Sequence, residues 1–155
     1  MATFNKGIAV VTGASSGIGA VYADRLARRG YDLILVARNE ARLDAVASRI
    51  SGATGRVVRT VAADLNDKAD LTRIEALLAT DPGITMLVNN AGVGALEPLL
   101  QSDIGAMEAM IDLNVTALTR LTYAAAPAFV ARGGGTILNI SSVVAVAPEV
   151  LNGVY

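Results

Sequence analysis

Short runs of aliphatic and β-branched residues alternate along this chain with longer segments in which apolar residues recur every three or four positions. The runs predict strands over residues 7–12, 32–36, 56–62, 84–89 and 136–140. The segments between them predict helices over residues 17–29, 40–50, 66–79, 102–112 and 113–131. Strict alternation of strands and helices indicates a parallel sheet that is covered by helices on both faces.

Right-handed crossovers between parallel strands make a doubly wound, Rossmann-like α/β sheet the expected fold. If the chain reverses direction after the third strand, the strands lie in the order 3-2-1-4-5. Ligands of such sheets bind at the carboxyl ends of the strands, beside the point between strands 1 and 4 where the order reverses. We therefore expect the functional residues directly after the five strands, in a single domain that spans residues 1–155.

The composition narrows the chemistry that this fold can carry. The 155 residues are 53% hydrophobic, enough to build a core, and the formal net charge is −1. Because the basic residues are scattered, we expect neither nucleic acid nor a membrane as partner. Cysteine and histidine are absent, which excludes disulfides, thiol nucleophiles, histidine triads and Cys/His metal sites, so no metal is expected. We find neither a secretory signal nor an apolar run of membrane-spanning length, and expect a soluble, cytoplasmic protein.

A glycine-rich turn, TGASSGIG at residues 12–19, follows the first predicted strand and opens the first helix. The first glycine permits a sharp turn, the second removes a side chain where a pyrophosphate approaches, and the third permits close packing of helix on strand. A tight strand–helix connection without a ligand is the alternative. If a dinucleotide binds, the helix amides face its phosphates, and the expected contacts are Gly13, Ser15, Ser16, Gly17, Ile18 and Gly19.

The residues that end the second strand bear on the choice of nucleotide. An acidic residue here would bond the adenosine ribose and repel a 2′-phosphate, but the chain has Ala37 followed by Arg38. A guanidinium pairs with a phosphate through two parallel hydrogen bonds, and the Ser15 hydroxyl would add a donor. We therefore predict NADP(H) in preference to NAD(H). The alternative is that Arg38 is a solvated surface residue.

Together with four further segments in the same order, the glycine turn resembles the short-chain dehydrogenase/reductase family over essentially all 155 residues. The resemblance implies that Asp64 binds the adenine amino group and that the backbone of Leu65 contributes. It also implies that Ala91 and Gly92, in the NNAG segment, leave room for the cofactor ribose, while Asn90 bonds backbone groups. For Asp64, capping of the helix that begins near residue 66 is the alternative.

The resemblance also supplies a catalytic set. Reduction of a carbonyl needs a hydride from nicotinamide and a proton for the developing alkoxide. Ser142 and Tyr155 match the family's spacing between its serine and tyrosine. The implied roles are charge stabilisation at the carbonyl oxygen by Ser142, and proton transfer by Tyr155, as acid in reduction and base in oxidation. Asn114 matches the family's helix asparagine and would hold a water in the proton relay.

These residues predict an oxidoreductase that transfers a hydride between NADP(H) and a small carbonyl or alcohol substrate. The family's lysine after the tyrosine, and its last two strands, would lie past Tyr155. We therefore expect this chain to be the first part of a longer enzyme, and a protein that truly ends at Tyr155 to be inactive. A non-catalytic dinucleotide-binding module is the alternative in that case.

Two features of the predicted enzyme stay open at this point. The resemblance suggests a homodimer or homotetramer, and the helix over residues 113–131 is apolar on more than one face, as in helices buried between subunits. The substrate is not identified. Val146, Pro148, Val150 and Leu151 would form an apolar substrate wall, or would simply pack their own loop.

Overall fold

The architecture comes from a computed structural model, which describes residues 6–95, 97–145 and 154–155. All five predicted strands and all five predicted helical regions are found in this part of the chain. The elements, in chain order, are β1 (Ile8–Thr12), α1 (Gly17–Arg28), β2 (Asp32–Ala37), α2 (Glu40–Thr54), β3 (Val58–Ala62), α3 (Lys68–Thr80), β4 (Ile84–Asn89), a 3₁₀ turn (Leu99–Gln101), α4 (Ile104–Ile111), a π-helical turn (Asp112–Ala117), α5 (Leu118–Ala131), β5 (Thr136–Asn139) and a second 3₁₀ turn (Val143–Ala145).

The strands form one parallel sheet in the order β3-β2-β1-β4-β5, as predicted. β1 lies at the centre, where Val10 pairs with Ile34 of β2 on one side and with Leu87 of β4 on the other. The chain reverses between β1 and β4, so the loops that leave these two strands diverge and open a crevice at the carboxyl edge of the sheet.

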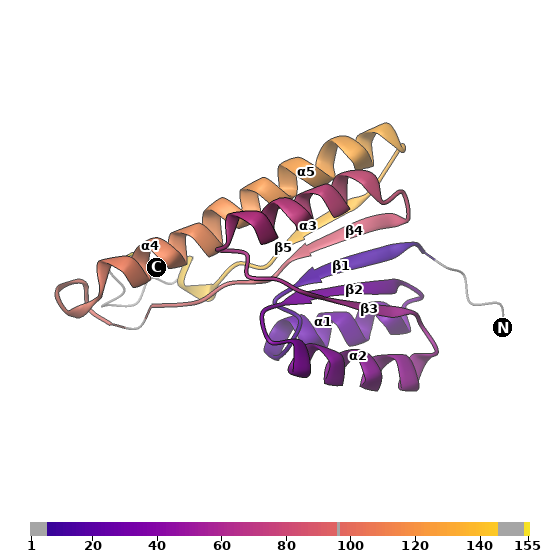
Figure 1. The fold of residues 1–155 in the computed structure, drawn as a ribbon, viewed down its shortest axis with the longest axis horizontal. Coiled ribbons are helices and arrows are strands. Elements are labelled where there is room, and N and C mark those ends of the chain that lie inside the picture. Colours follow the sequence, from indigo (N-terminus) through magenta and orange to yellow (C-terminus); the bar gives the residue numbers. More distant parts are fainter. Residues whose placement is uncertain (1–5, 96, 146–153) are drawn as a thin grey trace.

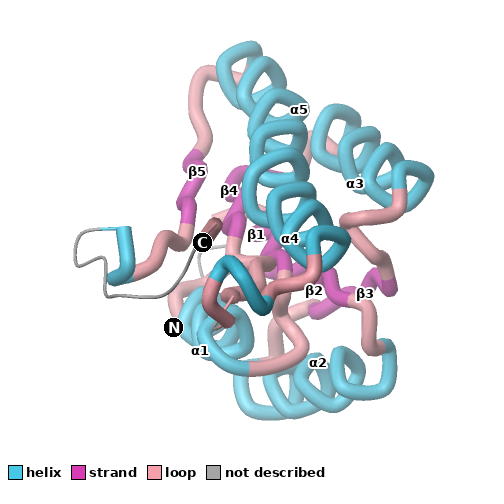
Figure 2. The backbone as a smooth tube through the Cα atoms, turned by 90° about the vertical axis from the view of Figure 1, so that its left-hand side faces the viewer, coloured by secondary structure: helices cyan, strands magenta, loops and turns pink. Residues whose placement is uncertain are grey.

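Helices cover the sheet on both faces (Figures 1 and 2), with α1 and α2 on one side and α3 and α5 on the other. Successive strand residues point to opposite faces, so each strand feeds two cores. Val10 and Ile34 belong to the cluster under α3 and α5, whereas Val11 and Leu33 belong to the cluster under α1 and α2. Burial on both faces explains why the strands are continuous apolar runs rather than alternating ones.

Side-chain bonds shift two of the predicted boundaries. The third helix begins at Lys68 and not near residue 66, because the Asp67 carboxylate accepts hydrogen bonds from the N–H groups of Ala69 and Asp70 and so caps it. β3 begins at Val58 and not at residue 56, because the Val57 N–H donates to the Asp32 carboxylate instead of to a main-chain carbonyl of β2.

The sequence predicts two separate helices over residues 102–131, but the structure has one continuous helical segment there. α4, the π turn and α5 follow one another without a break and form the longest helical rod in Figure 1. α4 begins only at Ile104, because Asp103 caps it by accepting from the Ala106 N–H. Apolar periodicity does not predict a π turn, which adds a residue to a helical turn and often occurs at functional sites.

The edge strand β5 is short. It has four residues, and Ile137 and Leu138 are both partly buried. Within residues 6–95, 97–145 and 154–155, no helix combines the length and the apolar character needed to cross a membrane.

Candidate active site

Two adjoining hollows lie at the carboxyl edge of the sheet. The first, which we call the edge groove, has a volume of about 540 Å³ and collects residues that follow β1, β2, β3 and β4. The second, which we call the β5 pocket, has a volume of about 450 Å³ and collects residues that follow β4 and β5, together with the π turn. The two share Ala91, Gly92 and Val93 as a common wall, so a long ligand in the groove would reach the pocket.

The glycine turn forms one end of the edge groove and leaves backbone donors uncapped. Ser16 is the N-cap of α1, but its side chain makes no capping hydrogen bond, and the first turn carries no acidic residue. The helices α2, α3 and α4 are instead capped by Asn39, Asp67 and Asp103. The first N–H groups of α1 are therefore open to an anionic ligand, which is a fit for a pyrophosphate.

Close packing at the turn explains two of its three glycines. A Cβ at Gly19 would collide with the carbonyl oxygen of Gly13 and would lie 2.5 Å from Asn90 Nδ2. Gly13 has a φ of 66° and would also collide with Asn90. Gly17 has a φ of 53° but meets nothing within 4 Å, so its missing side chain leaves open space above the turn.

Hydrogen bonds between the ends of β1 and β4 hold this turn in place. The buried Thr12 hydroxyl accepts from the N–H groups of Asn90 and Ala91, both at 3.0 Å, and donates to Val88 O. Asn90 Nδ2 donates to Thr12 O at 2.9 Å and to Gly13 O at 3.3 Å. Asn90 therefore bonds backbone groups, as the resemblance implied, and joins the two diverging loops.

Positive charge gathers where β2 leads into α2. Arg38 lies in the edge groove with Ser15, as the sequence suggested, and so does Arg42 from the first turn of α2. Both arginines are exposed, and in the part of the chain that the structure describes neither forms an ion pair. Sequence reasoning missed Arg42, because its place in the groove depends on where α2 begins.

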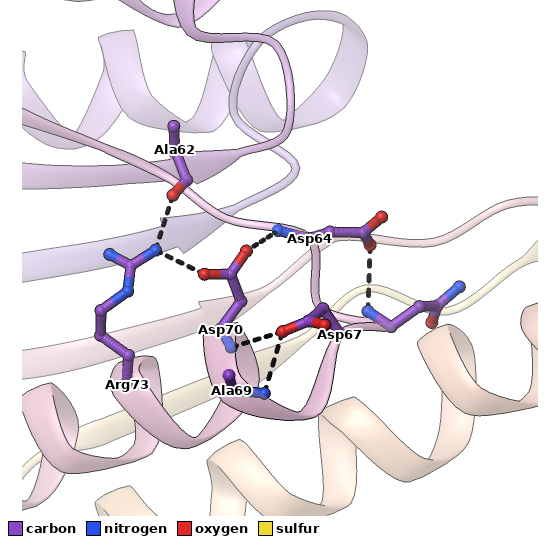
Figure 3. Close-up of polar contacts among 7 residues, drawn as sticks. Ala62, Asp64, Asp67, Ala69, Asp70 and Arg73 are labelled. Carbon is purple, nitrogen blue, oxygen red and sulfur yellow. Dashed lines mark hydrogen bonds and ion pairs between the residues drawn. The ribbon is translucent and has the colours of Figure 1, made fainter.

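Asp64 and Leu65 line the opposite end of the groove. A network of hydrogen bonds around Asp64, Asp70 and Arg73 (Figure 3) holds the main chain at this end. Asp70 accepts the Asp64 N–H at 2.8 Å and pairs with Arg73, which also donates to Ala62 O at 2.7 Å. The hydrogen bond from Arg73, and then that from the Asp64 N–H, lower the pKa of the Asp70 carboxyl below its ordinary value. The main chain that leaves β3 is thus held by an ionised carboxylate.

The Asp64 side chain is not a helix cap. Its Oδ1 accepts the Asn66 N–H at 3.0 Å, in a turn that precedes the Asp67 cap of α3. The alternative that Asp64 caps the third helix is therefore wrong. The second carboxylate oxygen, Oδ2, accepts no hydrogen bond within the described residues. The neighbouring Leu65 is buried. This leaves an acceptor at the groove wall.

The β5 pocket brings together the three residues that the resemblance implied for catalysis, Asn114, Ser142 and Tyr155. Ser142 Oγ accepts the Val144 N–H at 3.2 Å, which leaves the hydroxyl proton available to a ligand. The ring of Tyr155 lies beside Gly94, where an added Cβ would be 3.9 Å from Cε1.

Asn114 sits in the π turn and is bonded to the shared wall. Its Oδ1 accepts the Val93 N–H at 3.0 Å, and its Nδ2 donates to Val93 O at 2.8 Å. A Cβ at Gly92 would lie 3.0 Å from Asn114 Oδ1. Asn114 therefore holds the loop that separates the groove from the pocket, and a water at this residue stays a prediction.

Sequence reasoning did not single out Asn89 and Asn139, which join β4 to β5 below the pocket. The nearly buried Asn89 donates through Nδ2 to Asn139 Oδ1 at 3.0 Å and to Thr122 Oγ1 at 3.1 Å. Asn139 also lines the β5 pocket. A polar residue at the end of each of two paired strands was the available signal.

Two of the remaining expectations concern the substrate wall and metal binding. The proposed substrate wall at Val146, Pro148, Val150 and Leu151 lies outside the described residues. Among the described residues, no group of three or more Asp and Glu side chains is placed to hold a metal ion.

Comparison with known proteins identifies relatives of this arrangement. The profile of the short chain dehydrogenase family matches residues 7–155. A bulky-bulky ketone specific alcohol dehydrogenase from Comamonas testosteroni superposes with a TM-score of 0.94, at 44% identity, over 97% of this chain and 60% of its own. A short-chain dehydrogenase from Sphingobium yanoikuyae, solved in complex with NADPH, superposes with a TM-score of 0.93, at 49% identity, over 96% of this chain and 59% of its own.

A third relative is similar to this chain in sequence. Very-long-chain 3-oxoacyl-CoA reductase-A of Danio rerio is 37% identical over 151 residues, which are 95% of this chain and 47% of that protein. The chain spans about half to three fifths of the length of these relatives.

Proposed function

The chain belongs to the short chain dehydrogenase family, and on that premise we propose that the protein is an NADP(H)-dependent oxidoreductase. It transfers a hydride between the nicotinamide and a small carbonyl or alcohol substrate. The observation that carries the proposal is the shared wall at residues 91–93, which joins a groove suited to a dinucleotide to a pocket lined by Ser142 and Tyr155. A pocket with both a serine and a tyrosine favours the enzyme over a non-catalytic binding module.

The edge groove would hold the cofactor along its length. The pyrophosphate would bind the open N–H groups of the α1 N-terminus, from Ser16 to Gly19. The adenine amino group would donate to Asp64 beside Leu65, and the 2′-phosphate would bind Arg38 and Ser15. The Sphingobium yanoikuyae relative was solved with NADPH, which supports this choice of nucleotide.

The β5 pocket would hold the reacting carbonyl. Bound NADPH supplies the hydride. Ser142 Oγ accepts the Val144 N–H, and its own proton would be available to stabilise the oxygen on which charge develops. Tyr155 would then donate its phenol proton to that oxygen, and would remove a proton from the alcohol in the reverse direction. Asn114 would act as a positioning residue, through the loop at Val93 that separates cofactor from substrate.

The substrate is proposed only as a class. Relatives named for bulky ketones and for 3-oxoacyl thioesters both act on carbonyl groups, so the class is a ketone or the corresponding alcohol. A test is to give a panel of bulky ketones and 3-oxoacyl thioesters to the longer enzyme of which this chain is expected to be the first part, with NADPH consumption as the readout. Ser142→Ala and Tyr155→Phe should each lower kcat by about 10²-fold or more while the NADPH affinity changes little. Undiminished turnover by Tyr155→Phe would reject the assignment.

The apolar surface of α5 supports a homo-oligomer as part of this proposal. Tyr123 and Val130 are 78% and 79% exposed, and with Ala126 and Pro127 they line a shallow, almost wholly apolar hollow. Exposed apolar patches of this kind mark interfaces. We expect a second copy of the chain to cover this surface in a dimer or tetramer, and a cytoplasmic location stays a prediction.

A further inference from the structure

The helix α4 buries little of its own surface. Of its eight residues, all of which the structure describes, only Met110 is buried. A side chain from a distant part of the chain reaches its last turn, where Asn66 Nδ2 donates to Ala109 O at 3.1 Å. Asn66 belongs to the turn between β3 and α3, 43 residues earlier. Because α4 has so little buried surface, its position depends on this hydrogen bond.

Asn66 also orients the aspartate to which we assign the adenine amino group. The Asn66 main-chain N–H donates to Asp64 Oδ1 at 3.0 Å, and Asp64 Oδ2 stays open to a ligand. Asn66 therefore holds Asp64 with its main chain and α4 with its side chain. A ligand that bonds to Asp64 and orders this turn would reduce the entropy that the Asn66 side chain still has to lose when it bonds to α4.

The helix that Asn66 holds leads into the π turn, which carries Asn114. The π turn follows α4 without a break, directly after the turn that contains Ala109. Asn114 in its turn makes two hydrogen bonds to Val93, on the wall that the edge groove shares with the β5 pocket. A continuous path of contacts thus leads from Asp64 to the loop beside the reacting groups.

Apolar packing provides a second link between the same two regions. Leu65 follows Asp64, Leu113 precedes Asn114, and both leucines line the edge groove. Leu65 belongs to the buried cluster under α3 and α5, and Leu113 packs against that cluster. Among the described residues that line the groove, none belongs to α4. A nucleotide in the groove would therefore affect α4 indirectly, through its neighbours.

We propose that Asn66 is a positioning residue, which couples the adenine end of the edge groove to α4 and the π turn, and through them to Asn114. This role rests on the proposed function, because it takes the groove as the cofactor site. The adenosine half orders the Asp64 turn, the Asn66 carboxamide then bonds α4 at a lower entropic cost, and the π turn becomes fixed. Coupling is reciprocal, so order in α4 also favours binding of the adenosine half.

Amide hydrogen exchange at single residues, with adenosine 2′,5′-bisphosphate as the probe, measures this coupling. The probe contains the adenine but lacks the nicotinamide, so it leaves the β5 pocket empty. In the wild-type protein, saturating probe should slow exchange of the α4 amides by about threefold or more, which is within the strength of one ordinary hydrogen bond. In Asn66→Ala it should slow them by less than about 1.5-fold. The affinity for the probe should fall by less than about twofold, because the main-chain bond to Asp64 stays.

Asp103→Ala is the matched control, because it loosens α4 at the opposite end. Asp103 Oδ1 accepts the Ala106 N–H at 2.8 Å and so caps the helix. Exchange in α4 should be faster in this variant, both with and without the probe. The probe should still slow it by about threefold, because the Asn66 side chain is present. A purely structural role of Asn66 would make the two variants behave alike.

The longer enzyme, of which this chain is expected to be the first part, supplies a catalytic readout. Asn66→Ala should lower kcat by about threefold, because Asn114 is less well positioned. The KM for NADPH should change by less than about twofold, because the contacts to the nucleotide remain. A raised KM with unchanged kcat would place Asn66 in cofactor binding alone and overturn the positioning role.

The exchange outcomes separate this role from the proposed function. If the probe binds but does not slow α4 exchange in the wild-type protein, or slows it equally in Asn66→Ala, the coupling is wrong and the proposed function stands. A wild-type protein that does not bind the probe rejects the edge groove as the cofactor site, and the proposed function with it. Far-UV circular dichroism of each variant reports folding.

Discussion

Asn90 is joined to Thr12 by two hydrogen bonds, one from its main-chain N–H to the threonine hydroxyl at 3.0 Å and one from its Nδ2 to the threonine carbonyl at 2.9 Å. These bonds connect the ends of β4 and β1 at the point where the strand order reverses. They hold the glycine turn against the loop that separates the edge groove from the β5 pocket. The site therefore depends on a polar contact that lies beneath it.

Replacement of Thr12 by valine tests this contact. The substitution keeps the shape but removes the acceptor for two N–H groups, at a residue that is 1% exposed. We expect the free energy of unfolding to fall by about 2–4 kcal/mol, measured by urea denaturation. Thr12→Ser keeps the hydroxyl and should lose only about 1 kcal/mol, for the missing methyl group. Equal losses in the two variants would show that the hydroxyl does not matter.

The second and third glycines of the turn should respond differently to alanine. Gly17→Ala meets no neighbour but has an unfavourable positive φ, so we expect a stability loss of about 1 kcal/mol and a loss of nucleotide binding. Gly55→Ala is the matched control, because it has a φ of 68° with open space around it and lies at the far end of α2. It should show the same stability loss and normal nucleotide affinity. Gly19→Ala should destabilise by more than either, because of its collision with backbone.

The hydrogen bonds that Asp70 makes to Arg73 and to the Asp64 N–H should affect how the free energy of unfolding changes at acidic pH. The pKa of Asp70 is lowered in the folded protein by Arg73, so its ionised form stabilises the fold above the unfolded-state pKa of about 3.9. That contribution disappears as the pH falls through the lower, folded-state pKa. Asp70→Asn should therefore be less stable than wild type at neutral pH, with a difference that narrows below about pH 4.

The partner variant Arg73→Gln checks the cause of this behaviour. It should reproduce most of the Asp70→Asn effect, and the double variant should lose less than the sum of the two. Asp24, whose pKa is lowered by Arg28, contributes to the same dependence on acidic pH but is unchanged in all these proteins. If the free energy of unfolding of Asp70→Asn stayed below that of wild type by the same amount down to the lowest pH, the proposed stabilisation by ionised Asp70 would be contradicted.

The apolar surface on α5 predicts an effect on assembly. Val130→Asp places a charge at a residue that is 79% exposed in the isolated chain, and should dissociate the oligomer in analytical ultracentrifugation. Val57→Asn is the control, since Val57 is 62% exposed but lies just before β3, at the other end of the sheet. An unchanged sedimentation coefficient for Val130→Asp would place the interface elsewhere, or show that the protein is a monomer.

The sequence predicted the sheet well because its physical signals are local. Buried runs such as residues 7–12 and 84–89 are apolar on both faces, and their alternation with helices leaves few topologies. The glycine turn, Arg38 and Ser142 follow strand ends, where a doubly wound sheet brings loops together. For these residues, adjacency to a strand end was sufficient to predict their place in the groove or the pocket, whereas Tyr155 was predicted from the spacing that the family resemblance implies.

The features that the sequence did not predict depend on tertiary contacts or on the exact ends of helices. The pairing of Asn114 with Val93 needs the π turn, which has no periodicity of its own. Whether Asp64 or Asp67 caps α3 is decided by which carboxylate reaches the Ala69 N–H, since both residue types favour that position. Arg42 could not be assigned to the groove until the start of α2 was known.

The central claim is that the turn after β1 holds a dinucleotide diphosphate while Arg38 selects its additional phosphate. The most direct measurement is calorimetric titration of the wild-type protein and Arg38→Asp with NADPH and with NADH. The account predicts that wild type binds NADPH at least about tenfold more tightly than NADH, and that Arg38→Asp reverses or abolishes this preference. Absence of binding heat with both nucleotides, or equal affinities in the wild-type protein, would contradict it.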